Sequence, residues 1–319
     1  MTDGACSEQS GYSNEALLTP APHKAASLRQ LLQSGKTLPV PGAFNAICAK
    51  IIESIGFPLV YVSGAGLNNG LVGYPDIGML TLSEMVQASG YIARSVQIPT
   101  IADADTGFGE AINVYRTVQE YEREGLAGIH IEDQVFPKRC GHLGGKQVIS
   151  MEEMCLKVQA AKKARQNPDF LLIARVDSKA VNGYDDSLKR AIAYVKAGAD
   201  MIFPEALQTP DEFQQFATDF KSACPSAYLL ANMTEFGKTP LIALQDFERF
   251  GYNMVIYPMT AFRLMMKAVE DGLRQVLTDG TQAGLIDRMT TRQALYDLIH
   301  YDAYEALDKT LTHDLPSLS

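Results

Sequence analysis

The chain has 319 residues, of which 46% are hydrophobic and 20% are charged, and these proportions are typical of a globular protein. Its formal net charge of -9 argues against sequence-independent binding to nucleic acid, which needs a basic surface. No stretch approaches the roughly 18 consecutive apolar residues of a membrane-spanning helix, so we expect no membrane contact.

The cysteines are five in number, irregularly spaced and without a CxxC pair: Cys6, Cys48, Cys140, Cys155 and Cys224. This pattern argues against a disulfide framework and against a structural zinc site. Free thiols are typical of a reducing compartment, and we therefore expect a cytoplasmic protein.

Residues 1–22 are polar, rich in Ser, Gly, Pro and Thr, and without the apolar segment of a secretory signal. We expect a disordered lead-in over residues 1–23. A single domain is expected over residues 24–311.

Short apolar runs alternate with amphipathic stretches of helical length from about residue 25 onward. The runs expected to form strands are Leu38–Phe44, Leu59–Gly64, Thr100–Asp105, Ala127–Asp133, Phe170–Asp177, Met201–Ala206, Tyr228–Met233 and Met254–Met259. The stretches expected to form helices include Thr81–Val96, Glu110–Glu124, Ser150–Gln166, Asp185–Lys196, Pro210–Cys224 and Pro240–Phe250.

Eight strands that alternate with helices predict an α/β protein of the (β/α)8 TIM-type barrel class. A doubly wound open sheet is the alternative, but it normally has a Gly-rich phosphate loop after its first strand, and no GxGxxG occurs there. Gly56, Gly125, Gly198 and Gly251 stand where a helix should end before the next strand, which supports the repeated unit.

The segment from about residue 283 to 311 has a helical pattern and lies beyond the eighth unit. An appended helical segment must bury its apolar face. It can pack on its own barrel or on a neighbouring subunit, and we favour the neighbouring subunit.

Polar residues end almost every predicted strand, where catalytic groups of a barrel lie. They are Ser63, Asp103, Asp105, Glu132, Asp133, Asp177, Glu205 and Asn232, with Arg175 inside a strand and Arg263 after the last one. Buried polar groups are costly unless they are paired or bind a ligand, so this distribution favours an active site at the mouth of the barrel.

Asp103 and Asp105 are two apart on one strand, so their side chains share a face. Together with Glu132, and with Asp76 from a nearby loop, they could place carboxylate oxygens around Mg²⁺, or Mn²⁺ as a substitute. A pair of aspartates can also serve only in N-caps and loop hydrogen bonds, which is the structural alternative.

Arg175, Arg263 and Arg292 are candidates for binding carboxylates, because a guanidinium matches a carboxylate with two parallel hydrogen bonds. Arg292 lies in the C-terminal segment and could act only if that segment reached the mouth. His130 is in mid-strand and is expected to be a core residue.

The segment Lys138-Arg139-Cys140-Gly141-His142 follows the fourth predicted strand. Cationic neighbours favour the thiolate form of Cys140, so its proton can move near neutral pH. His142 is a candidate partner of this thiol.

With the DxD pair, Glu132-Asp133-Gln134 and Ser63-Gly64-Ala65, this segment resembles the isocitrate lyase and phosphoenolpyruvate mutase superfamily, and within it the methylisocitrate lyase branch. The resemblance covers about residues 24–309. Further motifs in family order are Pro75-Asp76-Ile77-Gly78, Pro204-Glu205, Asn232 through Gly237, and Tyr257 through Arg263. Ala65 and Met233 stand where Gly and Ile are common.

The resemblance implies a modified barrel whose eighth helix and tail are often exchanged between subunits of a homotetramer. It implies Mg²⁺ held by Asp103 and Asp105 with support from Asp76 and Glu132. It also implies substrate contacts, which would come from Ser63, Gly64, Ala65, Cys140, Gly141, Arg175, Glu205, Asn232, Met233, Thr234, Arg263 and Arg292.

The implied reaction is cleavage of 2-methylisocitrate, a tricarboxylate, to pyruvate and succinate in the methylcitrate cycle of propionate catabolism. Loss of the substrate hydroxyl proton would break a carbon–carbon bond, and Cys140 would then protonate the resulting carbanion as general acid. Tyr61 is one candidate for the base. Isocitrate lyase, 2,3-dimethylmalate lyase and a dicarboxylate-binding barrel without chemistry remain alternatives.

Overall fold

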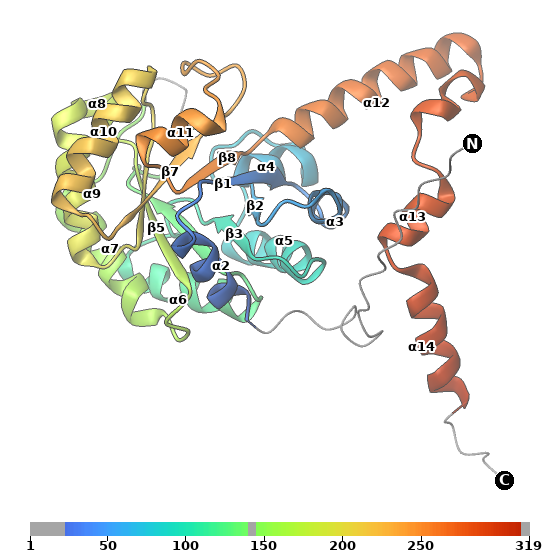
Figure 1. The fold of residues 1–319 in the computed structure, drawn as a ribbon, viewed down its shortest axis with the longest axis horizontal. Coiled ribbons are helices and arrows are strands. Elements are labelled where there is room, and N and C mark those ends of the chain that lie inside the picture. The colour runs from blue at the N-terminus through green and yellow to red at the C-terminus, as the bar shows by residue number, and fades with distance from the viewer. Residues whose placement is uncertain (1–22, 140–144, 314–319) are drawn as a thin grey trace.

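The computed structural model describes residues 23–139 and 145–313. Its eight parallel strands close into a barrel in which every strand pairs with its neighbours in sequence, and β8 pairs with β1 (Figure 1). The strands are β1 (Leu38–Ala43), β2 (Val60–Val62), β3 (Thr100–Asp103), β4 (Gly128–Glu132), β5 (Leu171–Val176), β6 (Met201–Pro204), β7 (Tyr228–Asn232) and β8 (Met254–Tyr257). The (β/α)8 barrel class is therefore confirmed, and each predicted strand contains one observed strand.

The helices surround the barrel, apart from α2 at one end and the C-terminal helices. They are α2 (Lys24–Gln33), α3 (Ala46–Ile55), α4 (Gly64–Leu71), α5 (Leu82–Arg94), α6 (Ala111–Arg123), α7 (Met151–Ala164), α8 (Lys179–Asn182), α9 (Tyr184–Ala197), α10 (Pro210–Ala223), α11 (Leu244–Phe250), α12 (Thr260–Asp279), the 3-10 helix η1 (Ala283–Arg288), α13 (Arg292–Leu298) and α14 (Tyr301–His313).

Local sequence signals set the ends of these helices. Thr81 and Ser150 each cap a helix and form a capping box with a glutamate three residues later. A cap of this kind stabilises a helix by about 1 kcal/mol. Gly56 and Gly251 end α3 and α11 in the left-handed conformation, as expected, because a side chain is strained there.

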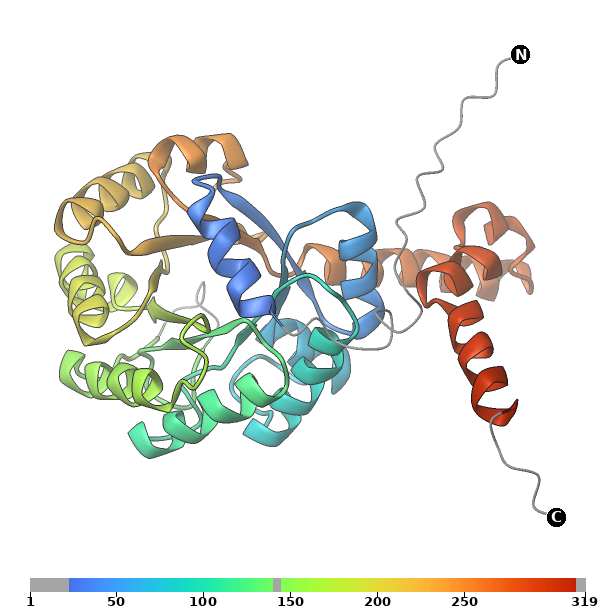
Figure 2. The same cartoon turned by 60° about the horizontal axis from the view of Figure 1, so that its bottom comes forward.

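Two apolar clusters make up the core. The larger lies between the strands and the surrounding helices, and the smaller fills the barrel interior. Figure 2 shows α2 lying across one end of the barrel. That end is the amino-terminal end of the strands, because Leu28 and Leu32 of α2 join the interior cluster beside Leu38, the first residue of β1. The interior is therefore closed on that side, and the open mouth is at the carboxyl ends of the strands.

The eighth helix, α12, leaves the barrel instead of covering it (Figure 1). Phe262 near its start is its one buried residue, and it packs edge-on against Phe44. Leu264, Leu273 and Leu277 further along α12 are more than half exposed. Within the described ranges, no helix is long and apolar enough to cross a membrane.

Candidate active site

Strand register brings the predicted acidic residues to one place at the mouth. Asp103 ends β3 and is the register partner of His130, while Glu132 ends β4 and is the partner of Arg175 on β5. Asp105 follows two residues after Asp103, and its N–H donates to Asp103 Oδ1 over 2.9 Å. These side chains are all nearly inaccessible to solvent.

Lys138 lies among these carboxylates. Its Nζ is 2.6 Å from Oδ1 of Asp105 and 2.6 Å from Oδ1 of Asp76, which comes from the loop between α4 and α5. Burial alone would lower the pKa of Lys138, but the carboxylates of Asp105, Asp103, Asp76 and Glu132 together raise that pKa well above its ordinary value. Lys138 therefore carries a positive charge inside an acidic cluster.

The acidic cluster suits a hard divalent cation in part. Burial raises the pKa of Asp105 to about 6, against the opposing effect of Lys138, and Asp105 Oδ2 is buried without a hydrogen-bond partner in the described residues. The same residues contain no group of three or more His, Cys, Asp or Glu side chains arranged to hold a metal ion. Mg²⁺ is commonly bound through one or two carboxylates and several waters, and the aspartates fit that mode.

Arg175 is held by carboxylates on three sides. Its Nε and Nη2 donate to the two oxygens of Asp177 over 2.9 and 3.0 Å, Nη1 lies 3.1 Å from Glu132, and Nε lies 3.8 Å from Glu205. Its guanidinium also stacks over the Phe203 ring, 5.2 Å from the ring centroid. A guanidinium has five N–H donors, so these partners orient Arg175 without using all of its donors.

Asp177 joins Arg175 to a second cation, because Lys146 Nζ lies 2.8 Å from Asp177 Oδ1. The two cations hold the pKa of Asp177 below its ordinary value, although burial opposes this. Lys146 is the second described residue after Cys140 in the chain, and this ion pair fixes it beside the carboxyl end of β5.

Gln134 fixes Arg139, the last described residue before Cys140. Its amide donates to Glu132 Oε1 over 3.0 Å and to the carbonyl of Arg139 over 2.8 Å, and its Oε1 accepts from the Arg139 N–H. Gln134 also forms a β-bridge with Val148. Cys140, Gly141 and His142 themselves lie outside the described residues, so their assigned roles remain predictions.

Ser63, Gly64 and Ala65 form the beginning of α4. Ser63 caps this helix by accepting from the Gly66 N–H over 3.1 Å. A Cβ at Gly64 would lie 2.4 Å from Asp103 Oδ2, so only glycine allows the helix to approach the aspartate this closely. The first-turn N–H groups of a helix have no intrahelical acceptor and can bind a carboxylate.

Tyr61 lies deeper in the barrel than Ser63. Its hydroxyl is 2.9 Å from Nε2 of His130, and the two rings are stacked. Burial, reinforced by Asp103, raises the pKa of Tyr61 well above its ordinary value. The phenol therefore keeps its proton at neutral pH. Tyr61 was one candidate for the base; a protonated phenol is better suited to donate a hydrogen bond, and its role remains a prediction.

The seventh strand contributes Asn232, whose Nδ2 donates to Glu205 Oε2 over 3.3 Å. Its Oδ1 is buried without a partner in the described part of the chain, and Thr234 beside it is half-buried. Met233 was expected to contact substrate at a position used through backbone groups, and this contact remains a prediction. The N–H of Met233 donates to Ile256 and its side chain belongs to the outer core.

The two remaining arginines lie outside the acidic cluster. Arg263, on the first turn of α12, is partly exposed, stacks over Phe236 and lies 3.5 Å from Glu235. Arg292 is exposed on α13, whose Leu298 faces a groove of about 1430 Å³ with Pro58 and Pro99. Those prolines precede β2 and β3, at the closed end of the barrel, so Arg292 does not reach the mouth of its own chain.

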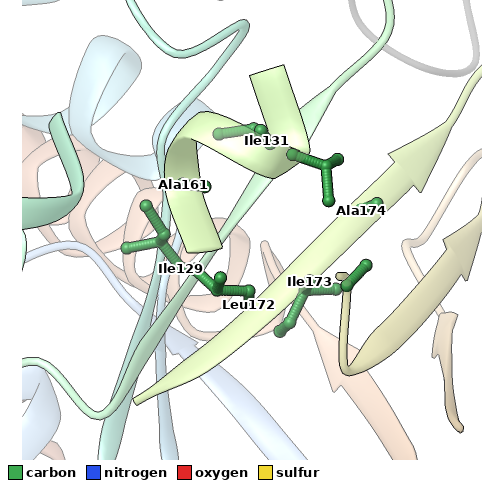
Figure 3. A pocket seen from close by; sticks show the side chains of 8 residues that line it. Ile129, Ile131, Ala161, Leu172, Ile173 and Ala174 are labelled. Atoms are coloured by element: carbon green, nitrogen blue, oxygen red, sulfur yellow. The ribbon is translucent and has the colours of Figure 1, made fainter. Parts of the chain in front are cut away.

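A separate small cavity lies between α7 and strands β4 and β5 (Figure 3). It measures about 10 Å³ and is lined only by apolar side chains, among them Ile129, Leu172 and Ala161. It is a packing gap and offers no group that could bind a polar ligand.

Sequence reasoning missed three features of the site. Lys138 was interpreted only as a charge beside Cys140, and Lys146 was not considered. His130 is a buried core residue as expected, but its contacts with Tyr61 and Asp103 were not foreseen. The sequence did contain one signal for the position of His130. His130 and Glu132 are two residues apart in β4, so their side chains lie on the same face of the strand.

Known proteins are similar to this chain over most of its length. A family profile described as "Phosphoenolpyruvate phosphomutase" matches residues 28–277. The chain is 48% identical to a 2-methylisocitrate lyase of Aeropyrum pernix over 91% of this chain and 92% of that protein. It is 44% identical to a 2,3-dimethylmalate lyase of Eubacterium barkeri, with 86% and 93% covered.

Two solved structures are similar throughout the barrel. A crystal structure of 2,3-dimethylmalate lyase, a PEP mutase/isocitrate lyase superfamily member, has a TM-score of 0.84 and 34% identity, covering 90% of this chain and 95% of that one. A phosphonopyruvate hydrolase in complex with oxalate and Mg²⁺ has a TM-score of 0.81 and 31% identity, covering 90% and 98%.

Proposed function

The chain belongs to the phosphoenolpyruvate mutase and isocitrate lyase family, and we propose from this that it is a carbon–carbon lyase that cleaves 2-methylisocitrate to pyruvate and succinate. The observation that supports this most is the match with 2-methylisocitrate lyases over nine-tenths of the chain, in a barrel whose mouth gathers carboxylates and cations. The substrate has three carboxylates, which the cations at the mouth would bind.

Mg²⁺ would be held by Asp103 and Asp105, with Asp76 and Glu132 contributing through waters. The buried, unpartnered Oδ2 of Asp105 supports this assignment, and one similar structure is a complex with Mg²⁺. A bound Mg²⁺ supplies Lewis acidity, which lowers the pKa of the substrate hydroxyl. Mn²⁺ has similar ligand preferences and would substitute.

The residues of the chain would orient the substrate and accommodate its charge. The first-turn N–H groups of Gly64 and Ala65 would bind the carboxylate of the pyruvate half. Arg175 and Asn232 would donate to the succinate half, where negative charge develops as the carbon–carbon bond breaks. Thr234 and Arg263 are further donors near the same strand ends.

Cys140 would complete the reaction. When a base accepts the hydroxyl proton, the carbonyl of pyruvate would form and the bonding electron pair would pass to the adjacent carbon of the succinate half. The thiol of Cys140 then donates its proton to that carbon. Gln134 and Lys146 support this assignment, because their contacts hold the described residues on either side of Cys140 close to the site.

A second candidate function is 2,3-dimethylmalate lyase, favoured by the 44% identity to a relative of that name. Dimethylmalate has two carboxylates where methylisocitrate has three. The two activities therefore differ in whether a cation must bind a third carboxylate. Isocitrate differs from methylisocitrate by one methyl, which a pocket discriminates by only about 1–3 kcal/mol.

The deciding experiment is a cleavage assay with Mg²⁺ on 2-methylisocitrate, isocitrate and 2,3-dimethylmalate in parallel, with pyruvate, glyoxylate, propionate and succinate measured. A kcat/KM for methylisocitrate at least tenfold above the other two is the expected result. Comparable or higher efficiency on dimethylmalate would overturn the assignment of substrate, and no cleavage of any of the three would overturn the assignment of reaction.

We further propose that the protein is a homotetramer of the cytoplasm. The exposed apolar residues of α12 have no partner surface in the described part of this chain, which supports burial against a second copy. In that assembly Arg292 would act at the mouth of a neighbouring barrel.

A further inference from the structure

His130 is completely buried in the middle of β4, beneath the acidic cluster. Its ring is stacked on Tyr61, with centroids 5.8 Å apart, and meets the Phe203 ring edge-on at 5.6 Å. Nε2 faces the Tyr61 hydroxyl at 2.9 Å and Asp103 Oδ1 at 3.6 Å. The two flanking rings therefore leave the imidazole little freedom to turn.

The two nitrogens of this imidazole have unequal surroundings. Nδ1 is buried and has no hydrogen-bond partner in the described residues, whereas Nε2 has two oxygen atoms in front of it. A neutral imidazole has a single N–H, so only one of the two nitrogens can donate a hydrogen bond.

The unequal surroundings select the tautomer. Buried N–H groups without an acceptor are rarer in proteins than acceptors without a donor. The proton therefore belongs on Nε2, where oxygen atoms can accept it, and the bare lone pair belongs on Nδ1. In that tautomer the Tyr61 oxygen accepts from His130, and the Tyr61 proton must be donated to another group.

We propose that His130 is a positioning residue that acts through Tyr61. Its Nε2–H engages the Tyr61 oxygen as an acceptor, so the phenolic proton is directed to the substrate at the mouth. Tyr61 then donates a hydrogen bond to the substrate oxygen that gains charge during cleavage. This inference rests on the proposed lyase function and adds to it a relay from a residue that touches no substrate.

Three variants of His130 separate this role from simple packing. The amide nitrogen of Gln lies near the position of Nε2, and that of Asn lies near the position of Nδ1. Leu fills the space and offers no donor. We expect His130→Gln to keep kcat within about threefold of wild type, while His130→Asn and His130→Leu lose roughly tenfold to a hundredfold with KM changed less than about threefold.

A double-mutant cycle with Tyr61→Phe tests the relay. If His130 acts through Tyr61, His130→Leu in the Tyr61→Phe background should lower kcat by less than about twofold further. Additive losses, or equal activity of the Gln and Asn variants, would overturn the proposal. Thermal unfolding of each variant checks that the kcat values are compared between folded proteins. If the Leu variant does not fold, the comparison of the Gln and Asn variants still tests the proposal.

A spectroscopic measurement keeps this inference separate from the proposed function. In protein labelled with 15N-histidine, we expect His130 to show a protonated Nε2 and an unprotonated Nδ1 at pH 7. A protonated Nδ1 would overturn the inference whatever reaction the enzyme catalyses. Failure of the wild type to cleave any of the three acids would overturn the proposed function and leave the tautomer measurement valid.

Discussion

The ammonium nitrogen of Lys138 lies 2.6 Å from the carboxylate of Asp105, and both side chains are almost completely buried. A buried ion pair of this kind is strongly destabilised when one partner is removed, because the other charge is left uncompensated. In this site the loss could be offset by a divalent cation, which would neutralise the same carboxylates. Lys138 and a bound Mg²⁺ would thus act on one group of charges.

Lys138→Met should therefore make stability depend on metal. Without Mg²⁺ we expect the variant to lose about 3–5 kcal/mol in unfolding free energy. With millimolar Mg²⁺ its unfolding temperature should rise more than that of the wild type, as measured by thermal unfolding. Lys267→Met, which removes an exposed partner of Asp271, is the matched control and should show neither effect. An equal response to Mg²⁺ in both proteins would contradict this account.

Asp105→Asn should weaken metal binding directly. A neutral amide replaces a carboxylate that has an unpartnered buried oxygen, so we expect the Kd for Mn²⁺ to rise at least about tenfold, measured by calorimetric titration. Cleavage activity should fall in parallel. Asp271→Asn on the exposed side of α12 is the control. Unchanged Mn²⁺ affinity in Asp105→Asn would remove Asp105 from the proposed ligand set.

The fold could be predicted from the sequence almost completely, because parallel strands covered on both faces appear as continuous apolar runs. Each of the eight predicted runs contains an observed strand, with ends that differ by three residues or fewer. The carboxyl ends of those strands then placed Asp103, Glu132 and Arg175 at one mouth. The course of α12 could not be predicted, because an amphipathic pattern does not reveal which surface will cover it.

The site was less predictable, because its contacts join segments far apart in sequence. Asp76 and Lys138 are separated by 62 residues, and nothing in the sequence indicates that they pair. Met233 occupies a motif position, but its side chain turns to the outer core. Arg292 is placed by the course of α12, which sequence patterns do not determine.

The role of Cys140 can be tested by replacing its sulfur. A hydroxyl is a far weaker acid than a thiol, so Cys140→Ser should lower kcat by at least about a hundredfold with little change in KM. Steady-state assays on 2-methylisocitrate would measure both constants. Cys155→Ser, at a half-buried free thiol on α7, is the control and should keep activity. Normal turnover by Cys140→Ser would show that another group supplies the proton.

The buried imidazole of His130 should make the protein less stable in acid. Its pKa is about 3 in the folded protein and about 6.5 in the unfolded chain, so the unfolded chain binds the extra proton between these values. The stabilising contribution is complete above pH 6.5 and is lost as the pH falls. At pH 5 the loss is about 2 kcal/mol. Urea unfolding at pH 7 and pH 5 measures how much unfolding free energy each protein loses between these values. The loss should be smaller for His130→Gln than for the wild type by that amount. Equal losses in the two proteins would show that His130 titrates normally.

The assembly can be tested on the exposed face of α12. Leu273→Glu and Leu277→Glu place charges where we expect a second copy to pack, so the variant pair should sediment as smaller species than the wild type. Arg274→Glu changes charge on the same helix at a position that makes an exposed ion pair, and should leave sedimentation unchanged. A monomeric wild type would contradict the tetramer and the assigned role of Arg292.

Because α2 closes one end of the barrel, it affects how products are released. Leu28 and Leu32 close the amino-terminal end, so both products must leave through the opening by which the substrate entered. The fragment bound nearer Tyr61 and Gly64 is then the last to depart, and the outer fragment must depart first. Product inhibition should reflect this order of release. The inner product should compete with substrate for the empty enzyme, and the outer product should give mixed inhibition.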